Sequence, residues 1–347
     1  MNYLDFLILY CTHKFNGERS VSATYHLLVG KKSSQTIQDS IIFRLSPLFG
    51  LFPELERSQI LNSTERMAAN QFLDESLKLT RAGLEYIENM KLHKPIPASL
   101  NGWEYGNEAR VMWRRLTIFT QVISNLVYEK KRYLPVTKNE EDLFWVKNFL
   151  QRNGASKEVL AKQLHDELRD ILSQCSNTEA SIFVLKLTSS TRIGLTSAQL
   201  AEKFADDLYY IQLLFWNIIH FIVRKLKGNT KSYSLLQYMI SDLKKEKNFT
   251  ASTLATFNLL KKGLEVEQIA NIRQLKKSTI EDHIVEIALN DPNTDLSAFI
   301  SLDDYNTIRE VIEKLHTTQL KMVKQHLEQP YSYFQIRLAF AMYRRDK

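Results

Sequence analysis

Apolar residues recur every three to four positions along most of this chain, and few residues interrupt the pattern. A repeat close to 3.6 residues places such side chains on one face of a helix, where they can be buried together. Helix-breaking residues are scarce, with 10 glycines and 7 prolines among 347 residues. The sequence therefore predicts an all-α fold in which most segments between breaks form amphipathic helices.

Breaks in the pattern divide the chain into three regions. Residues 1–60 are expected to form a small helical unit, residues 61–249 a helical middle region, and residues 250–347 a separate C-terminal region with a helical tail. Domains commonly hold about 100 to 200 residues, so a chain of this length is expected to form two or three.

The middle region contains the longest expected helices. An amphipathic helix is expected over 64–90, a loop over 101–108, and an aromatic-rich helix over 196–227 that begins after a capping-box pattern at Thr196. The role of the stretch 154–227 is not evident from its residues.

Cysteine use and hydropathy exclude several classes of protein. Cys11 and Cys175 are the two cysteines, and neither belongs to a Cys-x-x-Cys pair or a His/Cys cluster, so we expect no zinc site, other metal site or disulfide framework. The longest uncharged run, 208–223, is shorter than the roughly 20 apolar residues that a membrane span requires. We expect a soluble cytoplasmic protein without membrane association. Association with the nucleoid stays open.

The net charge of +7 permits association with an acidic polymer, and its distribution is uneven. From Ala251 onward, 13 Lys and Arg residues balance 13 Asp and Glu residues. One concentration of positive charge lies at 224–247, where seven Lys and Arg residues face Asp242 and Glu246. The C-terminal region is therefore neutral, and the excess of positive charge lies before it.

Residues 253–289 have the pattern of a helix-turn-helix. We expect a first helix over 253–262 that ends at Gly263, a short second helix over 267–273, and a third helix capped by Ser278. Glycine adopts the left-handed conformation that ends many helices. The residues expected to face the core are Leu254, Phe257, Leu260, Val266, Ile269, Ala270, Leu275, Ile280, Ile284 and Ile287.

The start of the third helix is the candidate DNA contact. In DNA-binding members of this motif the third helix enters the major groove, and its first residues meet base edges and phosphates. The candidates here are Lys276, Lys277, Ser278, Thr279 and His283. Glu281 and Asp282 oppose such a contact, so a helix-turn-helix that serves as a packing or partner-binding module stays open.

A similar string of residues occurs near the N-terminus. The sequence Lys31-Lys32-Ser33-Ser34-Gln35-Thr36-Ile37-Gln38-Asp39 parallels Lys276-Lys277-Ser278-Thr279-Ile280-Glu281-Asp282, and each string follows an apolar helix and a glycine. The N-terminal unit is therefore a candidate second helix-turn-helix-like element, with Lys31 and Lys32 as candidate DNA contacts. Coincidence of helix-capping chemistry is an equal alternative.

Aromatic and arginine side chains gather at 103–115. This cluster can stack the bases and hold the phosphates of a single strand, anchor a partner protein, or close the core. Its members are Trp103, Tyr105, Arg110, Trp113, Arg114 and Arg115.

No catalytic pattern is complete. Gly30-Lys31-Lys32 resembles the end of a phosphate-binding loop, but Tyr25 stands where that motif requires a glycine. His165-Asp166-Glu167 lacks the second histidine of a zinc-protease motif. We therefore expect no enzyme activity, no cofactor and no small-molecule substrate.

The C-terminal segment resembles the helix-turn-helix domain appended to some RecQ-type helicases. The residues that fill that pattern in register are Gly263, Ile269, Ala270, Arg273, Leu275, Ser278, Thr279, Ile280 and His283. Residues 20–40 also resemble the opening of the YpbB family of Firmicutes, whose members end in this same domain. The resemblance implies an accessory protein encoded beside a RecQ-like helicase, RecS, and acting with it in DNA replication, recombination or repair.

Two functions follow from these patterns. The first is an accessory protein that binds a RecQ-like helicase and, through the helix-turn-helix, DNA. The second is a sequence-specific transcription regulator, which is the commonest use of a helix-turn-helix.

Overall fold

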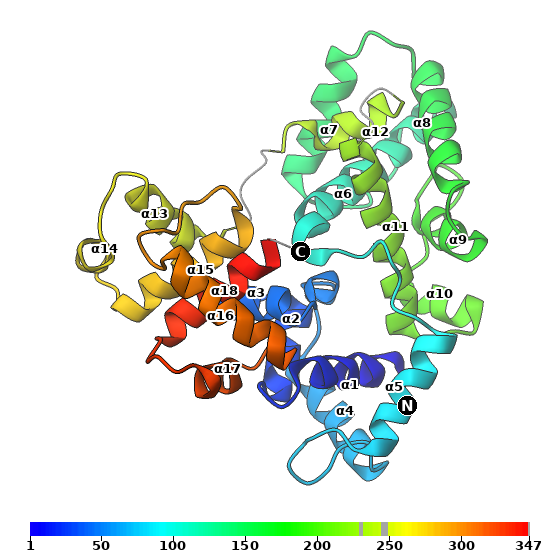
Figure 1. Ribbon diagram of the computed structural model, residues 1–347. Helices are drawn as coiled ribbons and strands as arrows, with labels where there is room; N and C mark the ends of the chain where they lie inside the picture. Colours follow the sequence, from blue (N-terminus) through cyan, green and yellow to red (C-terminus); the bar gives the residue numbers. More distant parts are fainter. Residues whose placement is uncertain (229–231, 244–248, 346–347) are drawn as a thin grey trace. The chain divides into compact units, whose positions relative to one another are not determined.

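The computed structural model describes residues 1–228, 232–243 and 249–345, which are folded as helices and the segments that connect them, without a β-strand among them (Figure 1). The prediction of an all-α fold is confirmed. By internal contacts the chain forms two compact units. Unit 1 comprises Met1–Leu9, Leu61–Ser76 and Thr80–Lys244, and unit 2 comprises Tyr10–Ile60, Leu77–Leu79 and Lys245–Lys347. Most of the expected region 1–60 and all of the expected region 250–347 thus belong to the same unit, unit 2.

Unit 1 is built around two long helices, α6 and α11, that pack against each other. Its core joins Leu116 and Phe119 of α6 to Ile218 and Ile219 of α11, all fully or almost fully buried. The helices within this unit are α5 (Arg81–His93), α6 (Gly102–Val127), α7 (Glu140–Arg152), α8 (Lys157–Leu172), α9 (Asn177–Lys186), α10 (Ser197–Phe204), α11 (Leu208–Gly228) and α12 (Ser234–Ser241).

Unit 2 is built around α15, which contacts α3, α13, α14 and α18. Its C-terminal core gathers Ile284, Ile308, Ile336 and Phe340. The helices within this unit are α2 (Val21–Val29), α3 (Ser34–Ile42), the short η1 (Ser46–Leu48), α13 (Ala251–Leu260), α14 (Val266–Arg273), α15 (Lys277–Asn290), α16 (Leu302–Leu315), α17 (Leu320–His326) and α18 (Tyr333–Arg345). Helices α1 (Tyr3–Phe15) and α4 (Arg57–Ala69) contribute residues to both units.

The expected helix over 64–90 is wrong, because the chain forms α4 and α5 with a connection between them. Gln71 and Leu77 in this connection have left-handed backbone angles, φ 58° and 57°, which end helical hydrogen bonding. Thr80 then caps α5 by accepting a hydrogen bond from the backbone of Gly83. The sequence carries no glycine at either left-handed position, so its apolar spacing alone indicated one helix.

The boundaries of two other expected elements also differ. The loop expected over 101–108 is the first part of α6, because Asn101 caps that helix through the backbone of Glu104. The single helix expected over 196–227 is divided into α10 and α11 at Ala205, whose φ is 50°. Alanine rarely adopts this conformation, so the break had no signature in the sequence.

No helix among the described residues is both long enough and apolar enough to cross a membrane. Four of the seven basic residues in the positive segment 224–247 fall outside the described residues. They are Lys231, Lys244, Lys245 and Lys247.

Candidate nucleic-acid interface

The segment 253–289 folds as α13, α14 and α15 with a tight turn between the last two helices. Gly263 follows α13 with a φ of 79°, as its position after the apolar run predicts. Gln274 ends α14 in the left-handed conformation, and Glu265 and Gln268 form a capping box at its start. Ile280 and Ile284 of α15 pack with Ile269 in the core. The predicted helix-turn-helix is therefore present.

Two details of this motif differ from the prediction. The residue that precedes α15 is Lys276, and no side chain caps the helix, so Ser278 lies within the first turn and is not the cap. Leu254 of α13 was expected to face the core, but it is 44% exposed. Helix α13 packs on α15 through Phe257 together with Thr253 and Thr256, which are fully buried.

The first turn of α15 is accessible. Lys276, Lys277 and Ser278 are exposed, and Thr279 is half-buried. Lys277 Nζ donates a hydrogen bond to Glu267 Oε1 of α14 at 2.6 Å. This bond raises the pKa of Lys277, so its ammonium stays charged at neutral pH. Because both side chains are exposed, the ion pair is weak and can exchange for a phosphate.

Residues 283–288 of α15 are buried. His283 is 4% exposed, and its Nδ1 lies 2.8 Å from Thr256 Oγ1 of α13. Burial, and then the nearby Arg273, lower the pKa of His283 to about 4, so the imidazole is neutral at pH 7. The structure thus places this candidate in the core, where it holds α13 and α14 against α15.

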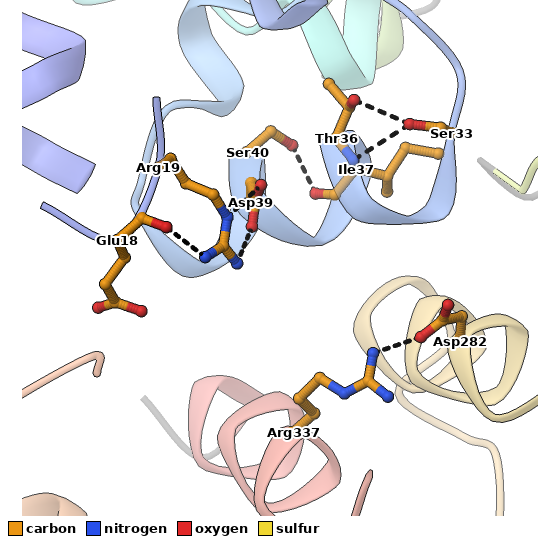
Figure 2. A network of polar contacts seen from close by, with 9 residues as sticks. All are labelled: Glu18, Arg19, Ser33, Thr36, Ile37, Asp39, Ser40, Asp282 and Arg337. Atoms are coloured by element: carbon orange, nitrogen blue, oxygen red, sulfur yellow. Dashed lines mark hydrogen bonds and ion pairs between the residues drawn. The ribbon is translucent and has the colours of Figure 1, made fainter. Parts of the chain in front are cut away.

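Helix α3 covers another face of α15. Ser34 Oγ donates to Glu286 Oε2 at 2.8 Å, and Gln38 Nε2 donates to the backbone oxygen of Asp282 at 3.1 Å. Figure 2 shows Asp282 with its ion-pair partner Arg337 on α18, close to α3. Because α3 covers this face of α15, the exposed residues at the start of the helix are the ones best placed to approach a base pair.

The contacts between α3 and α15 also fix where the two lysine pairs lie. Ser34, early in α3, meets Glu286, late in α15, whereas the later Gln38 meets the earlier Asp282. The two helices are therefore antiparallel. At 1.5 Å per residue, the ten positions from Lys276 to Glu286 span about 15 Å.

Lys31 and Lys32 precede α3 and are exposed, as the sequence led us to expect of a surface contact. Because α3 and α15 are antiparallel, these two residues lie at the opposite end of the helix pair from Lys276 and Lys277. The similar sequence strings do not build one combined patch.

The aromatic residues predicted at 103–115 lie on α6 within unit 1. Tyr105 is 9% exposed, and Trp103 is half-buried. The ring of Trp113 packs against Phe183 and Phe215, with centroids 5.4 and 4.8 Å away. Trp113 and Tyr105 thus contribute to the core and do not present open faces on which bases can stack.

The arginines of this cluster have partners in the same unit. Arg115 donates to Asp242 Oδ1 at 2.6 Å and to the backbone oxygen of Met239 at 2.7 Å, and Arg114 forms an ion pair with Asp142. The guanidinium of Arg110 lies 5.7 Å from the ring centroid of Trp216. These contacts favour packing, and binding of a strand or a partner by the cluster stays a prediction.

Sequence reasoning missed the residues that cover α15. Ser34 and Gln38 are four residues apart on α3, and Asp282 and Glu286 are four residues apart on α15. Such spacing places each pair on one side of its helix. The signal in the sequence was a pair of polar residues with this spacing on each helix. Neither pair indicates its partner, which lies more than 240 residues away. Among the described residues, no group of three or more His, Cys, Asp or Glu side chains is arranged to hold a metal.

A short second helix, a left-handed turn and a third helix with an accessible start define a helix-turn-helix protein. A family model described as a helix-turn-helix domain matches residues 252–340. The chain is also 38% identical to Protein YpbB of Bacillus subtilis (strain 168) over 344 residues, which are 98% of this chain and 97% of that protein. The chain therefore belongs to the YpbB family. No solved structure matches it.

Proposed function

We propose that this protein is a non-enzymatic, DNA-associated accessory protein that binds a RecQ-like helicase of the RecS type. The observation that carries the proposal is the state of α15, which is the third helix of a helix-turn-helix and whose fully exposed residues, Lys277 and Ser278, both lie in its first turn. Such an element can hold a phosphate backbone, but it reads little sequence.

The chemistry of the first turn supports backbone contact. Lys276 and Lys277 supply two positive charges, and Ser278 supplies a hydroxyl, all on the surface. Phosphate contacts set position and orientation on a duplex, whereas side chains on base edges give specificity. With His283 in the core and Asp282 paired to Arg337, α15 has few groups left for base edges.

The helicase enters the proposal through resemblance. The segment that matches the helix-turn-helix of RecQ-type helicases includes buried positions, Ile269 and Ile280, and the exposed Ser278. A domain that resembles the helix-turn-helix of such a helicase, but lies on a separate chain, is suited to act beside the enzyme. Neutral overall charge after Ala251 also fits a protein contact better than tight DNA binding.

Size-exclusion chromatography of the purified chain with a purified RecQ-like helicase from the same organism tests the partner. We expect one co-eluting species at micromolar concentration. Separate elution of the two proteins contradicts the helicase proposal, whatever the chain does with DNA.

Binding to several duplexes of unrelated sequence tests the second function. We expect affinities that agree within a few-fold. A transcription regulator instead prefers its site over other DNA by about 10³-fold or more, and that result favours the regulator.

A further inference from the structure

A cavity of about 510 Å³ opens within unit 2, away from the start of α15. It lies among the end of α1, the turn after α3, the turn after α16, and α18. Its lining is Lys14, Ile42, Phe43, Arg44, Ile312, His316, Thr317, Thr318, Phe340, Tyr343 and Arg344. Pockets that hold small molecules usually have volumes of about 300 to 1,000 Å³, so this one is large enough for a nucleotide.

The charged groups of the lining are all of one sign. Lys14, Arg44, His316 and Arg344 supply basic side chains, and no Asp or Glu belongs to the lining. In the part of the chain that the structure describes, no carboxylate forms an ion pair with Arg44 or Arg344. A basic concavity without a carboxylate favours an anion.

Arg344 is held in place by backbone and not by an acid. Its Nη2 donates a hydrogen bond to the carbonyl oxygen of Ile42. Burial, and then the guanidinium of Arg44, lower the pKa of Arg344 to about 10. Both groups are positively charged at pH 7 and repel each other, and an anion between them relieves that repulsion.

Two of the basic residues have a backbone conformation that favours glycine. Arg44, after α3, has a φ of 56°, and His316, after α16, has a φ of 47°. Side chains with a Cβ rarely adopt these angles, and such residues concentrate at functional sites. Glycine at either position would suit the backbone better.

We propose that this cavity binds a phosphoryl group through Arg44, Arg344 and Lys14. Guanidinium groups match the oxygens of phosphate in paired hydrogen bonds. The hydroxyls of Thr317 and Thr318 add donors at the rim.

The apolar floor of Ile42, Ile312 and Phe340 adjoins these groups. It accommodates the part of a ligand that carries the phosphate, which can be a DNA backbone or a free nucleotide. The site does not rest on the proposed function, because it predicts binding of a phosphate-bearing probe even if the helix-turn-helix binds no DNA.

Calorimetric titration of the full chain with sodium pyrophosphate, with ADP, and with a single strand of twenty thymidines tests the site. The test variant is Arg44→Gln with Arg344→Gln, and the control is Lys261→Gln with Lys262→Gln, which removes the same charge from an exposed part of unit 2. We expect the test variant to weaken binding by at least about tenfold, the loss typical of a charged hydrogen bond, and the control to bind as the unaltered chain does.

The source of the phosphate follows from which probe binds. Binding of pyrophosphate and ADP, each weakened in the test variant, indicates a free nucleotide. Binding of the oligonucleotide alone, also weakened, indicates a DNA backbone. The proposal is overturned if no probe binds at millimolar concentration, or if the test variant and the control bind equally.

A second variant separates binding from folding. Arg44→Gly removes the guanidinium and relaxes the left-handed backbone, so we expect an unchanged or higher melting temperature together with the weakened binding. A lower melting temperature with unchanged binding assigns Arg44 a structural role and overturns the site.

Discussion

The same three residues, Lys-Lys-Ser, stand where the chain enters α3 and where it enters α15, yet the two turns are built differently. Gly30 ends α2 at a φ of 75°, and Ser33 then caps α3 by accepting a hydrogen bond from the backbone of Thr36. At the other turn, Gln274 takes the left-handed position with a φ of 51°, and α15 begins right after Lys276. The second turn is one residue shorter.

This difference decides what each turn can bind. In the longer turn both lysines precede the helix, and the hydroxyl of Ser33 is engaged at the cap. In the shorter turn the half-buried Leu275 takes up the first position, which moves Lys277 and Ser278 into the first helical turn with their side chains exposed. A pattern of residue types therefore does not define a contact surface until the register of the helix start is known.

Both turns depend on the packing of α3 against α15, which Glu286 anchors. This buried carboxylate accepts hydrogen bonds from Ser34, from the backbone of Thr250 at 2.6 Å and from Thr253 at 2.8 Å. We expect Glu286→Ala to lower the unfolding free energy by about 3 kcal/mol, because it leaves the buried Thr253 and two part-buried donors without this acceptor. Urea unfolding measures this. Glu281→Ala on the same helix is the control, and an equal effect of both changes contradicts the assignment.

The two left-handed positions should respond in opposite directions to substitution. A Cβ at Gly30 would lie 2.7 Å from the Cα of Gly50, so Gly30→Ala should cost about 2 kcal/mol or more. Gln274→Gly should stabilise the protein by up to about 1 kcal/mol, because glycine adopts this conformation without strain. Thermal unfolding of both variants provides the measurement. If both substitutions stabilise the protein, or both destabilise it, the two turns respond alike and the comparison is contradicted.

The serines of the two strings should also differ. Ser33→Ala removes a helix cap and should cost about 1 kcal/mol. Ser278 caps nothing, so Ser278→Ala should change stability by less than about 0.5 kcal/mol. A larger loss at Ser278 than at Ser33, seen in urea unfolding, would refute the difference in register.

The smallest expected effect is a dependence of stability on pH in unit 2, the unit that contains α2 and α3. Burial, as the main cause, raises the pKa of Glu18 from 4.5 to about 7, and its Oε1 has no hydrogen-bond partner among the described residues. The unfolded chain loses this proton at lower pH than the folded chain does. Stability therefore falls as pH rises from about 4.5 to 7 and levels off above that range.

Glu18→Gln removes this penalty. Because the side chain is partly exposed and screened by solvent, we expect a gain of about 1 kcal/mol or less at pH 8 and none at pH 4. Melting temperatures of both proteins across this range provide the test. A gain that is the same at every pH means that Glu18 does not titrate between the two states.

The local parts of the fold were predictable from the sequence. The buried Ile280, Ile284 and Ile287 followed from their spacing, and the turn at Gly263 after α13 followed from the conformational freedom of glycine. The break at Ala205 was not predictable, because a left-handed alanine depends on surrounding packing that spacing does not report.

The candidate site was only partly predictable, since its accessibility depends on distant residues. His283 lies close in sequence to the exposed start of α15, but Thr256 of α13 and Arg273 of α14 enclose it. Likewise, Arg114 and Arg115 had the composition of a phosphate site, whereas their partners Asp142 and Asp242 lie elsewhere in the sequence. The resemblance to the YpbB family, by contrast, is confirmed over nearly the whole chain.

The salt dependence of DNA binding tests the role of the first turn of α15 most directly. The logarithm of the binding constant falls linearly with the logarithm of salt concentration, with a slope of about 0.9 for each phosphate contact. We predict that Lys276→Ala with Lys277→Ala reduces this slope by about 1 to 2, whereas the control Lys261→Ala with Lys262→Ala leaves it unchanged. An unchanged slope in the first variant, or an equal reduction in both, would contradict DNA contact through the start of α15.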